Sequence, residues 1–337
     1  MRAMLLDRTA PLDEEPEPLE LREVPDPVPG PGEILVEVTV CGVCHTELDE
    51  IEGRTPPPRL PVIPGHEVVG RVAGAGPGCS RFRPGDRVGV GWIHASDGSA
   101  EENLSAAFRA TGRDVDGGYA EFMTVPEAYA VEIPAAFDDA EAAPLLCAGA
   151  VGYRALRLTG LENGEPLGLT GFGGSGHLVL QLAKHRFPAS PVFVFARSPR
   201  EREFAAMLGA DWCGNTEAEP PVPLAAIIDT TPAWTPVLAA LERLAPGGRL
   251  VINAIRKEAG DAAVLRGLRY EDHLWLEKEI KSVANVTYRD LAEFLPLAAE
   301  IPLSVTTRGY ALEQANEALN ALRKGHIRGA YVLHIKQ

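Results

Sequence analysis

Four side chains of the sequence are of the types that bind zinc. Cys44 and Cys147 offer thiolates, His66 offers an imidazole and Glu67 a carboxylate, and zinc prefers these ligands. A catalytic zinc site needs three firm protein ligands and one exchangeable position. Each residue taken alone is weak evidence, because a single cysteine is more often buried and inert. The interpretation therefore depends on the segments in which the four residues stand.

A glycine-rich segment offers a second kind of chemistry. Gly171, Gly173, Gly174 and Gly176 follow a predicted strand and precede a stretch with helical apolar spacing. Glycines at a strand-to-helix turn let the backbone approach a pyrophosphate, and the helix N-terminus faces its negative charge. This context predicts a dinucleotide site.

The end of the next predicted strand bears on the choice of dinucleotide. Residues 192–195 run into Ala196-Arg197-Ser198-Pro199-Arg200, which contains no acid. An Asp or Glu there binds the ribose 2′-hydroxyl of NAD, whereas Arg accommodates the 2′-phosphate of NADP. We therefore expect NADP(H) to be favoured, with Arg197 and Ser198 reading the phosphate and Arg200 in support. The alternative is an NAD(H) enzyme in which Arg197 stacks on the adenine.

The elements that must position these residues differ on the two sides of residue 150. Before it, residues 33–40 alternate with period two, as in a half-buried strand, and Gly/Pro turns separate further strand candidates. This pattern predicts a small β-barrel. After it, strands and helices alternate, which is typical of a parallel sheet covered on both faces. The expected strands are 68–72, 86–90, 167–170, 192–195, 225–229, 249–253 and 330–335, and the expected helices are 177–184, 200–208 and 237–244.

The segments around the zinc-type residues resemble, in this order, the zinc-containing alcohol dehydrogenases of the medium-chain dehydrogenase/reductase superfamily. The zinc signature of that family is matched by Gly65, His66, Glu67, Gly70, Gly76 and the small residue Cys79. The glycine-rich loop and the C-terminal segment match as well, so the resemblance covers nearly the whole chain.

The resemblance implies a fold and an activity. It implies a GroES-like β-barrel catalytic domain over residues 1–150, to which residues 288–337 return. It also implies a Rossmann domain with a doubly wound parallel sheet over residues 151–287. The implied reaction interconverts alcohols with aldehydes or ketones by hydride transfer to or from NAD(P).

The same resemblance implies the metal ligands. Cys44, His66 and Cys147 would be permanent zinc ligands. Glu67 would lie beside the metal, either bound directly or exchanging with water or substrate. Glu47 stands where relatives place an acid behind the zinc-bound histidine; the alternative is an exposed glutamate at a helix start.

Further catalytic and cofactor roles follow from matching positions. Thr46 stands where a hydroxyl contacts the substrate oxygen. Asp49 replaces a histidine that often continues the proton relay, so it either passes the proton on or is a plain surface aspartate. Arg328, in Gly325-His326-Ile327-Arg328, and His45 are candidates for the pyrophosphate.

One departure from the family pattern stands out. The stretch from Trp92 to Asp116 contains none of the cysteines that hold a structural zinc in many relatives, so we expect one zinc per chain. Leu104 and Phe108, four residues apart, are expected to pin a short helix in this lobe instead. Trp92 itself is expected to line the substrate pocket, and residues 254–255 to lie near the nicotinamide.

Composition narrows the class of protein. The 337 residues suit two domains, and the net charge of −15 disfavours nucleic acid and acidic membranes as partners. There is no apolar run long enough for a membrane span and no apolar signal-peptide core, so we expect a cytoplasmic enzyme of small molecules. Five irregularly spaced cysteines favour metal ligation or burial over disulfides. We also expect a homo-oligomer, either a dimer or a tetramer.

Three other functions remain alternatives. A polyol dehydrogenase is the nearest, because some members also lack the structural zinc. A quinone or enone reductase of the same superfamily would share the cofactor domain but lack the cysteine and Gly-His-Glu ligands that this chain retains. A nucleotide-binding sensor without turnover would have no use for the zinc-type residues beside a hydroxyl.

Overall fold

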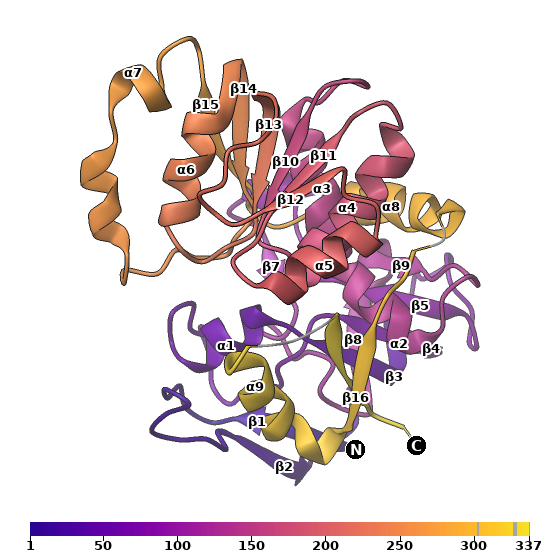
Figure 1. The fold of residues 1–337 in the computed structure, drawn as a ribbon. Coiled ribbons are helices and arrows are strands. Elements are labelled where there is room, and N and C mark those ends of the chain that lie inside the picture. Colours follow the sequence, from indigo (N-terminus) through magenta and orange to yellow (C-terminus); the bar gives the residue numbers. More distant parts are fainter. Residues whose placement is uncertain (302, 326–328, 337) are drawn as a thin grey trace. The chain divides into compact units, whose positions relative to one another are not determined.

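The computed structural model describes residues 1–301, 303–325 and 329–336, which group into two compact units (Figure 1). The first unit comprises residues 1–150, 285–299 and 305–337, and the second comprises residues 151–284 and 300–304. The chain passes from the first to the second within helix α3 (Ala148–Thr159). Among the described residues there is no helix long and apolar enough to cross a bilayer.

The first unit is built on a seven-stranded sheet. Its strand order is β16-β17-β3-β4-β5-β9, with β8 also paired to β3, and all pairs except β16–β17 are antiparallel. The sheet strands are β3 (Glu33–Val43), β4 (Val68–Ala75), β5 (Arg87–Val90), β8 (Phe122–Pro126), β9 (Ala130–Glu132), β16 (Thr307–Ala311) and β17 (Ala330–His334). Small two-stranded sheets are formed by β1 (Arg2–Leu6) with β2 (Leu19–Glu23) and by β6 (Ile93–Ala95) with β7 (Arg109–Ala110).

Strand β3 shows why this sheet forms and how it reaches the candidate site. Ile34, Val36, Val38 and Val40 are all buried, whereas the residues between them are half-buried, so the predicted alternation is confirmed. The strand runs three residues beyond the predicted end and stops directly before Cys44. The zinc-type residue therefore stands at the end of a rigid element.

Short helices complete the first unit. They are α1 (His45–Ile51), α2 (Asp139–Ala142), α8 (Tyr288–Glu300) and α9 (Ala315–Arg323), with 3₁₀ turns η1 (Glu102–Leu104), η2 (Glu127–Tyr129), η3 (Ala143–Leu146) and η5 (Leu312–Gln314). The segment 312–323 is thus divided into the 3₁₀ turn η5 and helix α9.

The second unit is a six-stranded parallel sheet in the order β12-β11-β10-β13-β14-β15. In chain order this is 3-2-1-4-5-6, the doubly wound arrangement of dinucleotide-binding sheets. The strands are β10 (Leu167–Thr170), β11 (Val192–Phe195), β12 (Trp212–Gly214), β13 (Leu224–Asp229), β14 (Leu244–Ile252) and β15 (Glu279–Ser282). The helical elements besides α3 are α4 (Gly174–Arg186), α5 (Pro199–Met207), α6 (Thr235–Arg243), the 3₁₀ turn η4 (Ala262–Gly267) and α7 (Tyr270–His273).

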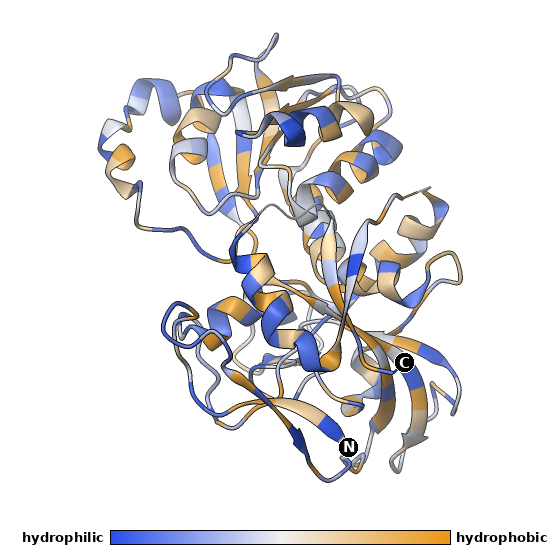
Figure 2. Ribbon diagram, turned by 60° about the horizontal axis from the view of Figure 1, so that its bottom comes forward, coloured by the Kyte–Doolittle hydropathy of each residue, from blue (hydrophilic) through white to orange (hydrophobic). Residues whose placement is uncertain are grey.

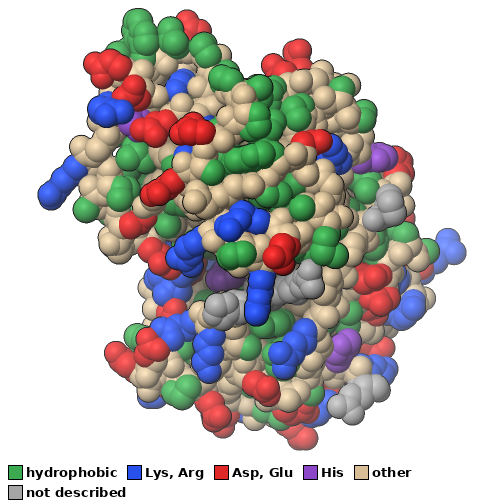
Figure 3. Space-filling view, in the orientation of Figure 1, with side chains coloured by type: hydrophobic (Ala, Val, Ile, Leu, Met, Phe, Trp, Pro, Cys, Tyr) green, Lys and Arg blue, Asp and Glu red, His purple; other side chains and the backbone are tan. Residues whose placement is uncertain are grey.

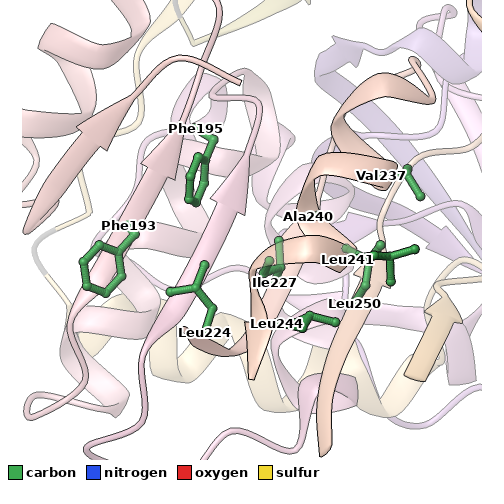
Figure 4. Close-up of a cluster of buried hydrophobic side chains, with 9 residues drawn as sticks. All are labelled: Phe193, Phe195, Leu224, Ile227, Val237, Ala240, Leu241, Leu244 and Leu250. Carbon is green, nitrogen blue, oxygen red and sulfur yellow. The ribbon is translucent and has the colours of Figure 1, made fainter. Parts of the chain in front are cut away.

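One cluster of the second unit's apolar core lies between α6 and the sheet. Figure 4 shows Val237, Ala240 and Leu241 of α6 facing apolar side chains of β11, β13 and β14. Each fully buried Leu or Phe side chain there contributes roughly 1.5–3 kcal/mol by leaving water. In Figure 2 the helices carry both hydrophobic and hydrophilic residues, as expected for elements with one buried face. This packing holds the carboxyl ends of the strands in fixed positions.

The short helix predicted in the lobe between β6 and β7 is absent. Residues 104–108 do not form a helix: only the 3₁₀ turn η1 is present, and Leu104 is 62% exposed. Instead, the buried carboxylate of Glu102 accepts hydrogen bonds from the Tyr129 hydroxyl at 3.0 Å and from the Tyr288 backbone N–H at 2.7 Å. A buried carboxylate with two donors thus ties the lobe to η2 and to the start of α8.

Candidate functional site

The four zinc-type residues converge within the first unit. Cys44 precedes α1, His66 and Glu67 lead into β4, and Cys147 follows η3. One ligand atom from each of the four lies within 4.8 Å of the others. This separation suits a single metal ion, because first-row metal ligands lie about 2.0–2.3 Å from the ion.

The imidazole of His66 is oriented by Glu47. Its Nδ1 lies 2.5 Å from Glu47 Oε1, and both side chains are buried. The other carboxylate oxygen of Glu47 accepts from the Cys44 backbone N–H at 2.8 Å. With Nδ1–H donated to Glu47, Nε2 keeps the lone pair, and this buried nitrogen has no hydrogen-bond partner among the described residues. Glu47 is therefore not the exposed helix-start glutamate of the alternative interpretation.

Electrostatics around His66 also favour a cation. Burial lowers the pKa of His66, but the Glu47 carboxylate and the Cys44 sulfur outweigh burial and raise the pKa well above its usual value. The same negative groups would stabilise a metal ion at Nε2, where it would compete with a proton. Metal binding is consequently expected to release protons and to depend on pH.

The two cysteines form a free thiol pair. Their Sγ atoms lie 3.8 Å apart, and neither takes part in a disulfide. The hydrogen bond with Cys147 lowers the pKa of Cys44 well below its usual value, and the same hydrogen bond, together with burial, raises the pKa of Cys147. A metal would bind both sulfurs as thiolates, so metal binding is expected to release the remaining thiol protons.

Glu67 completes the group from the next position along the chain. Its side chain is 3% exposed and packs over Gly42, where a Cβ would come within 1.8 Å of Glu67 Oε2. Burial, and then the Cys44 sulfur, raise the pKa of Glu67 well above its usual value. The glycine is therefore needed for close approach, and the carboxylate is held where it can meet a cation. The donor set of two sulfurs, one unpartnered imidazole nitrogen and one carboxylate fits zinc.

Helix α1 carries the residues proposed for proton transfer. Thr46 is 7% exposed, and its hydroxyl oxygen lies 3.6 Å from Cys44 Sγ. Asp49 is 1% exposed and forms an ion pair with Arg54 at 2.5 Å, so it is not a plain surface aspartate. His45, the first residue of α1, is exposed.

Trp92 lies beside the candidate metal ligands, and two of its contacts escaped the sequence analysis. Its ring centroid is 6.3 Å from that of His66 and 5.6 Å from that of Phe108. Its indole N–H donates to Glu50 at 3.3 Å, and the Arg113 guanidinium lies 5.6 Å from the ring centroid. Burial, and then the Glu47 charge, raise the pKa of Glu50 well above its usual value. A glutamate in a Leu-Asp-Glu-Ile helix gives no sequence signal that it will be buried.

The predicted glycine loop joins β10 to α4 in the second unit. Gly171 has a φ of +78°, and Gly176 packs against the Gly171 carbonyl. A Cβ at Gly173 or Gly174 would meet no described atom within 4 Å. These two glycines therefore present bare backbone at the N-terminus of a 13-residue helix, which is a favourable place for a phosphate.

The residues expected to read the ribose lie beyond β11. Arg197 and Arg200 are exposed, and Ser198 is half-buried just before α5. Arg202, which the sequence analysis passed over, donates to the carbonyls of Ala196 at 2.7 Å and Arg197 at 2.9 Å and so fixes the turn. Arg328, proposed for the pyrophosphate, lies outside the described residues.

Comparison with known proteins finds relatives along the whole chain. Residues 30–135 match the alcohol dehydrogenase GroES-like domain, in agreement with the fold expected for the first unit. A probable alcohol dehydrogenase of Mycobacterium tuberculosis is 43% identical over 347 residues, covering 99% of this chain and 97% of the relative. An alcohol dehydrogenase of Geobacillus stearothermophilus is 33% identical, with 97% of this chain and 99% of the relative covered.

Solved structures resemble the chain at full length. A cobalt- and zinc-bound thermostable alcohol dehydrogenase from Pyrobaculum aerophilum has a TM-score of 0.84 at 26% identity, covering 99% of each chain. A cinnamyl alcohol dehydrogenase from Sorghum bicolor has a TM-score of 0.80 at 26% identity, covering 98% of this chain and 97% of that one. The likeness therefore includes both units.

Proposed function

Because this chain belongs to the alcohol dehydrogenases of the medium-chain dehydrogenase/reductase superfamily, which interconvert alcohols and carbonyl compounds with NAD(P), we propose that it does so at one zinc ion held by Cys44, His66 and Cys147. The observation that supports this most is the buried His66 Nε2, which has no partner among the described residues and lies in one group with two thiols and a carboxylate. Zinc bound there would supply Lewis acidity to the substrate oxygen and lower the pKa of its hydroxyl.

The chain's own residues would then handle the proton. Thr46, buried beside Cys44, would accept the hydrogen bond of the substrate hydroxyl. Asp49 follows one helical turn later, and its partner Arg54 has a side chain that is 36% exposed. We propose that the proton passes from Thr46 toward Asp49 and from the Asp49 carboxylate to water beside Arg54, because the guanidinium itself keeps its proton. Glu67 would serve as the exchangeable carboxylate beside the metal.

Metal analysis and turnover test the proposed centre together. Cys44→Ser or His66→Ala should lose both bound zinc and alcohol oxidation, because each removes one of three firm ligands. Cys213→Ser is the matched control, since Cys213 is a free, half-buried cysteine on β12 in the second unit. Dialysed wild type and the control should each hold about one zinc per chain.

Two results would contradict the proposal. Full activity in metal-free protein would rule out a catalytic zinc ion. A reproducible value near two, with the second ion mapped to residues 92–116, would contradict the single site. Glu67→Gln should reduce turnover more than zinc content; total zinc loss in that variant would make Glu67 a permanent ligand.

For the dinucleotide we propose a preference for NADP(H), with NAD(H) as the weaker alternative. The support is the exposed Arg197 at the end of β11 and the absence of an acid from residues 196–200. Arg197→Asp should shift the ratio of kcat/KM values toward NAD on the order of tenfold, because a bidentate phosphate contact is replaced by a like charge. A wild type that already prefers NAD would overturn this assignment.

We also propose that the chain forms a homo-oligomer. Strand β15 is the terminal strand of the parallel sheet and all four of its residues are exposed. Ile280 on it and the nearby Trp275 are 46% and 53% exposed, and Figure 3 shows hydrophobic side chains gathered on the second unit where α7 lies. Open strand edges with apolar side chains are typical pairing surfaces. Light scattering after gel filtration should give a multiple of the 36.0 kDa chain mass; a monomer at micromolar concentration would contradict the proposal.

A further inference from the structure

A buried ion pair lies at the carboxyl edge of the parallel sheet. Lys257, on the segment after β14, has a side chain that is only 10% exposed and pairs with the fully buried carboxylate of Asp229 at the end of β13. The Lys257 Nζ also donates to the carbonyls of Thr231 at 2.7 Å and Ala233 at 3.0 Å. All three acceptors lie on one loop, residues 229–233, so this lysine determines the path of that loop.

The same pair reaches the strand that leads into the glycine loop. Asp229 Oδ1 accepts from the hydroxyls of Thr170 at 2.6 Å and Thr231 at 2.8 Å. Thr230 donates to the Thr170 carbonyl through both its backbone N–H, at 2.9 Å, and its hydroxyl, at 3.0 Å. The ends of β10 and β13 and the segment after β14 are thus joined by one hydrogen-bonded network.

The loop lies directly against the first glycine of the phosphate-binding turn. A Cβ at Gly171 would come within 2.7 Å of Thr230 Oγ1 and 2.9 Å of Thr231 Cγ2. Displacement of residues 229–233 would therefore move or release the turn at Gly171. The network therefore contacts the candidate dinucleotide site where the side chains of Thr230 and Thr231 meet the backbone of Gly171.

The segment that carries Lys257 makes two further contacts, one with the loop and one with the start of α6. The backbone N–H of Glu258 donates to the Pro232 carbonyl at 2.7 Å. The Asp261 carboxylate accepts from the backbone N–H groups of Trp234, at 3.0 Å, and Thr235, at 2.8 Å. The segment after β14 thus contacts both the loop and the start of α6, and Lys257 is the charged residue among these contacts.

Stability alone does not explain a lysine at this position. Replacing a buried ion pair by apolar side chains is often neutral or stabilising, because desolvation of the two charges offsets their attraction. The lysine does, however, fix the directions of the Asp229 carboxylate and of the Thr231 and Ala233 carbonyl groups. In parallel sheets of this order, ligands bind outside the carboxyl ends of the strands, at the point where the order reverses. Here that point lies between β10 and β13, which the pair connects.

We propose that Lys257 is a positioning residue for the nicotinamide half of the dinucleotide. The end of β11 serves the adenosine half, so the ends of β13 and β14, on the other side of the reversal, serve the second mononucleotide. Lys257 and Asp229 preform the loop 229–233 on that side, before the ligand arrives. The inference rests on the dinucleotide dependence of the family and not on the proposed zinc ion.

Equilibrium binding to the holoenzyme, without turnover, tests the proposal. Lys257→Met should raise the Kd of NADPH or NADH on the order of tenfold, comparable with the loss of an outer supporting contact at other sites. The Kd of adenosine 2′-monophosphate and of adenosine should stay unchanged, because these probes reach neither the nicotinamide side nor the phosphate-binding turn at Gly171. A merely destabilised fold would weaken both kinds of ligand.

The chain offers a matched control. Lys184 pairs with Asp211 at 2.9 Å, and Asp211 accepts from the backbone N–H of Val192, at the amino end of β11. Lys184→Met therefore removes a lysine–aspartate pair from the opposite edge of the same sheet and should leave every Kd unchanged.

A second variant keeps the test decisive if Lys257→Met fails to fold. The double variant Lys257→Met with Asp229→Asn leaves no unpaired buried charge, while the asparagine oxygen can still accept from Thr170. It should fold and show the same selective loss of dinucleotide affinity. Unchanged dinucleotide binding, an equal loss for the adenosine probes, or the same loss in Lys184→Met would each overturn the proposal.

Discussion

The contact between Glu47 and His66 allows a quantitative test of how the metal centre is supported. In Glu47→Gln the side-chain oxygen can still accept from His66 Nδ1, but the hydrogen bond is no longer charge-assisted. The amide nitrogen would then face the Cys44 backbone N–H, which now donates to Glu47 at 2.8 Å. One variant thus weakens the orientation of one ligand and disturbs the backbone of another.

Both effects lower zinc affinity. Loss of an outer partner of a ligating histidine typically weakens metal binding about 10- to 100-fold, or roughly 1.4–2.7 kcal/mol. A backbone donor left without an acceptor costs about 1–3 kcal/mol in addition, to the extent that water cannot reach it. We therefore expect Glu47→Gln to bind zinc at least about tenfold more weakly than wild type.

Competition with a chromophoric chelator at pH 7 measures this affinity. Glu50→Gln is the matched control, because Glu50 lies on the same helix, is equally buried and can keep its Trp92 hydrogen bond as an amide. Burial already raises the pKa of Glu50, so a neutral amide is a close substitute. Equal zinc affinity in wild type and Glu47→Gln, or equal losses in both variants, would refute the reasoning.

Three further predictions concern other parts of the first unit. Burial lowers the pKa of His94 to about 4, so the folded protein keeps this ring neutral. The free energy of unfolding should therefore fall by up to about 3 kcal/mol as the pH falls from about 6.5 toward 4. Urea unfolding of His94→Gln should show a smaller fall over this range, and an identical pH profile would contradict the assignment. Glu102→Leu leaves a buried hydroxyl and a helix N–H without their acceptor, which should cost about 1–3 kcal/mol for each group, whereas Glu101→Leu at the neighbouring exposed position should not destabilise the lobe. Gly42→Ala places a Cβ 1.8 Å from Glu67 Oε2, so kcat/KM should fall on the order of 100-fold by displacement of that carboxylate, with full activity as the contrary result.

The sequence by itself determined the elements whose physics is local. Alternation of apolar residues along 33–40 predicts β3 because side chains on a strand point to opposite faces with period two. The glycines of 171–176 predict a strand-to-helix turn because the backbone there needs conformations and close approaches that other residues resist. The alternation of strands and helices after residue 150 predicts the parallel sheet, which the structure confirms. In each case neighbours within a few positions carry the information.

Only the tertiary structure decided which polar side chains leave water. Glu50, Glu102 and Lys257 lie in segments that resemble ordinary solvated surface, yet all three are buried or nearly so. Their partners are distant along the chain: the carboxylate of Glu102 meets Tyr288, 186 residues away. Periodicity within residues 104–108 predicted a helix that is absent for the same reason, because a long-range hydrogen bond rather than local packing holds that lobe.

The candidate metal centre combines both kinds of information. The types of Cys44, His66 and Cys147 and their motifs could be recognised from the sequence. Their convergence could not, because 103 residues separate the two sulfurs that lie 3.8 Å apart. The support of His66 by Glu47, whose burial the sequence left open, likewise depends on a contact between α1 and the segment before β4. Local chemistry selects the ligands, and the packing of the sheet and α1 in the first unit determines whether they meet.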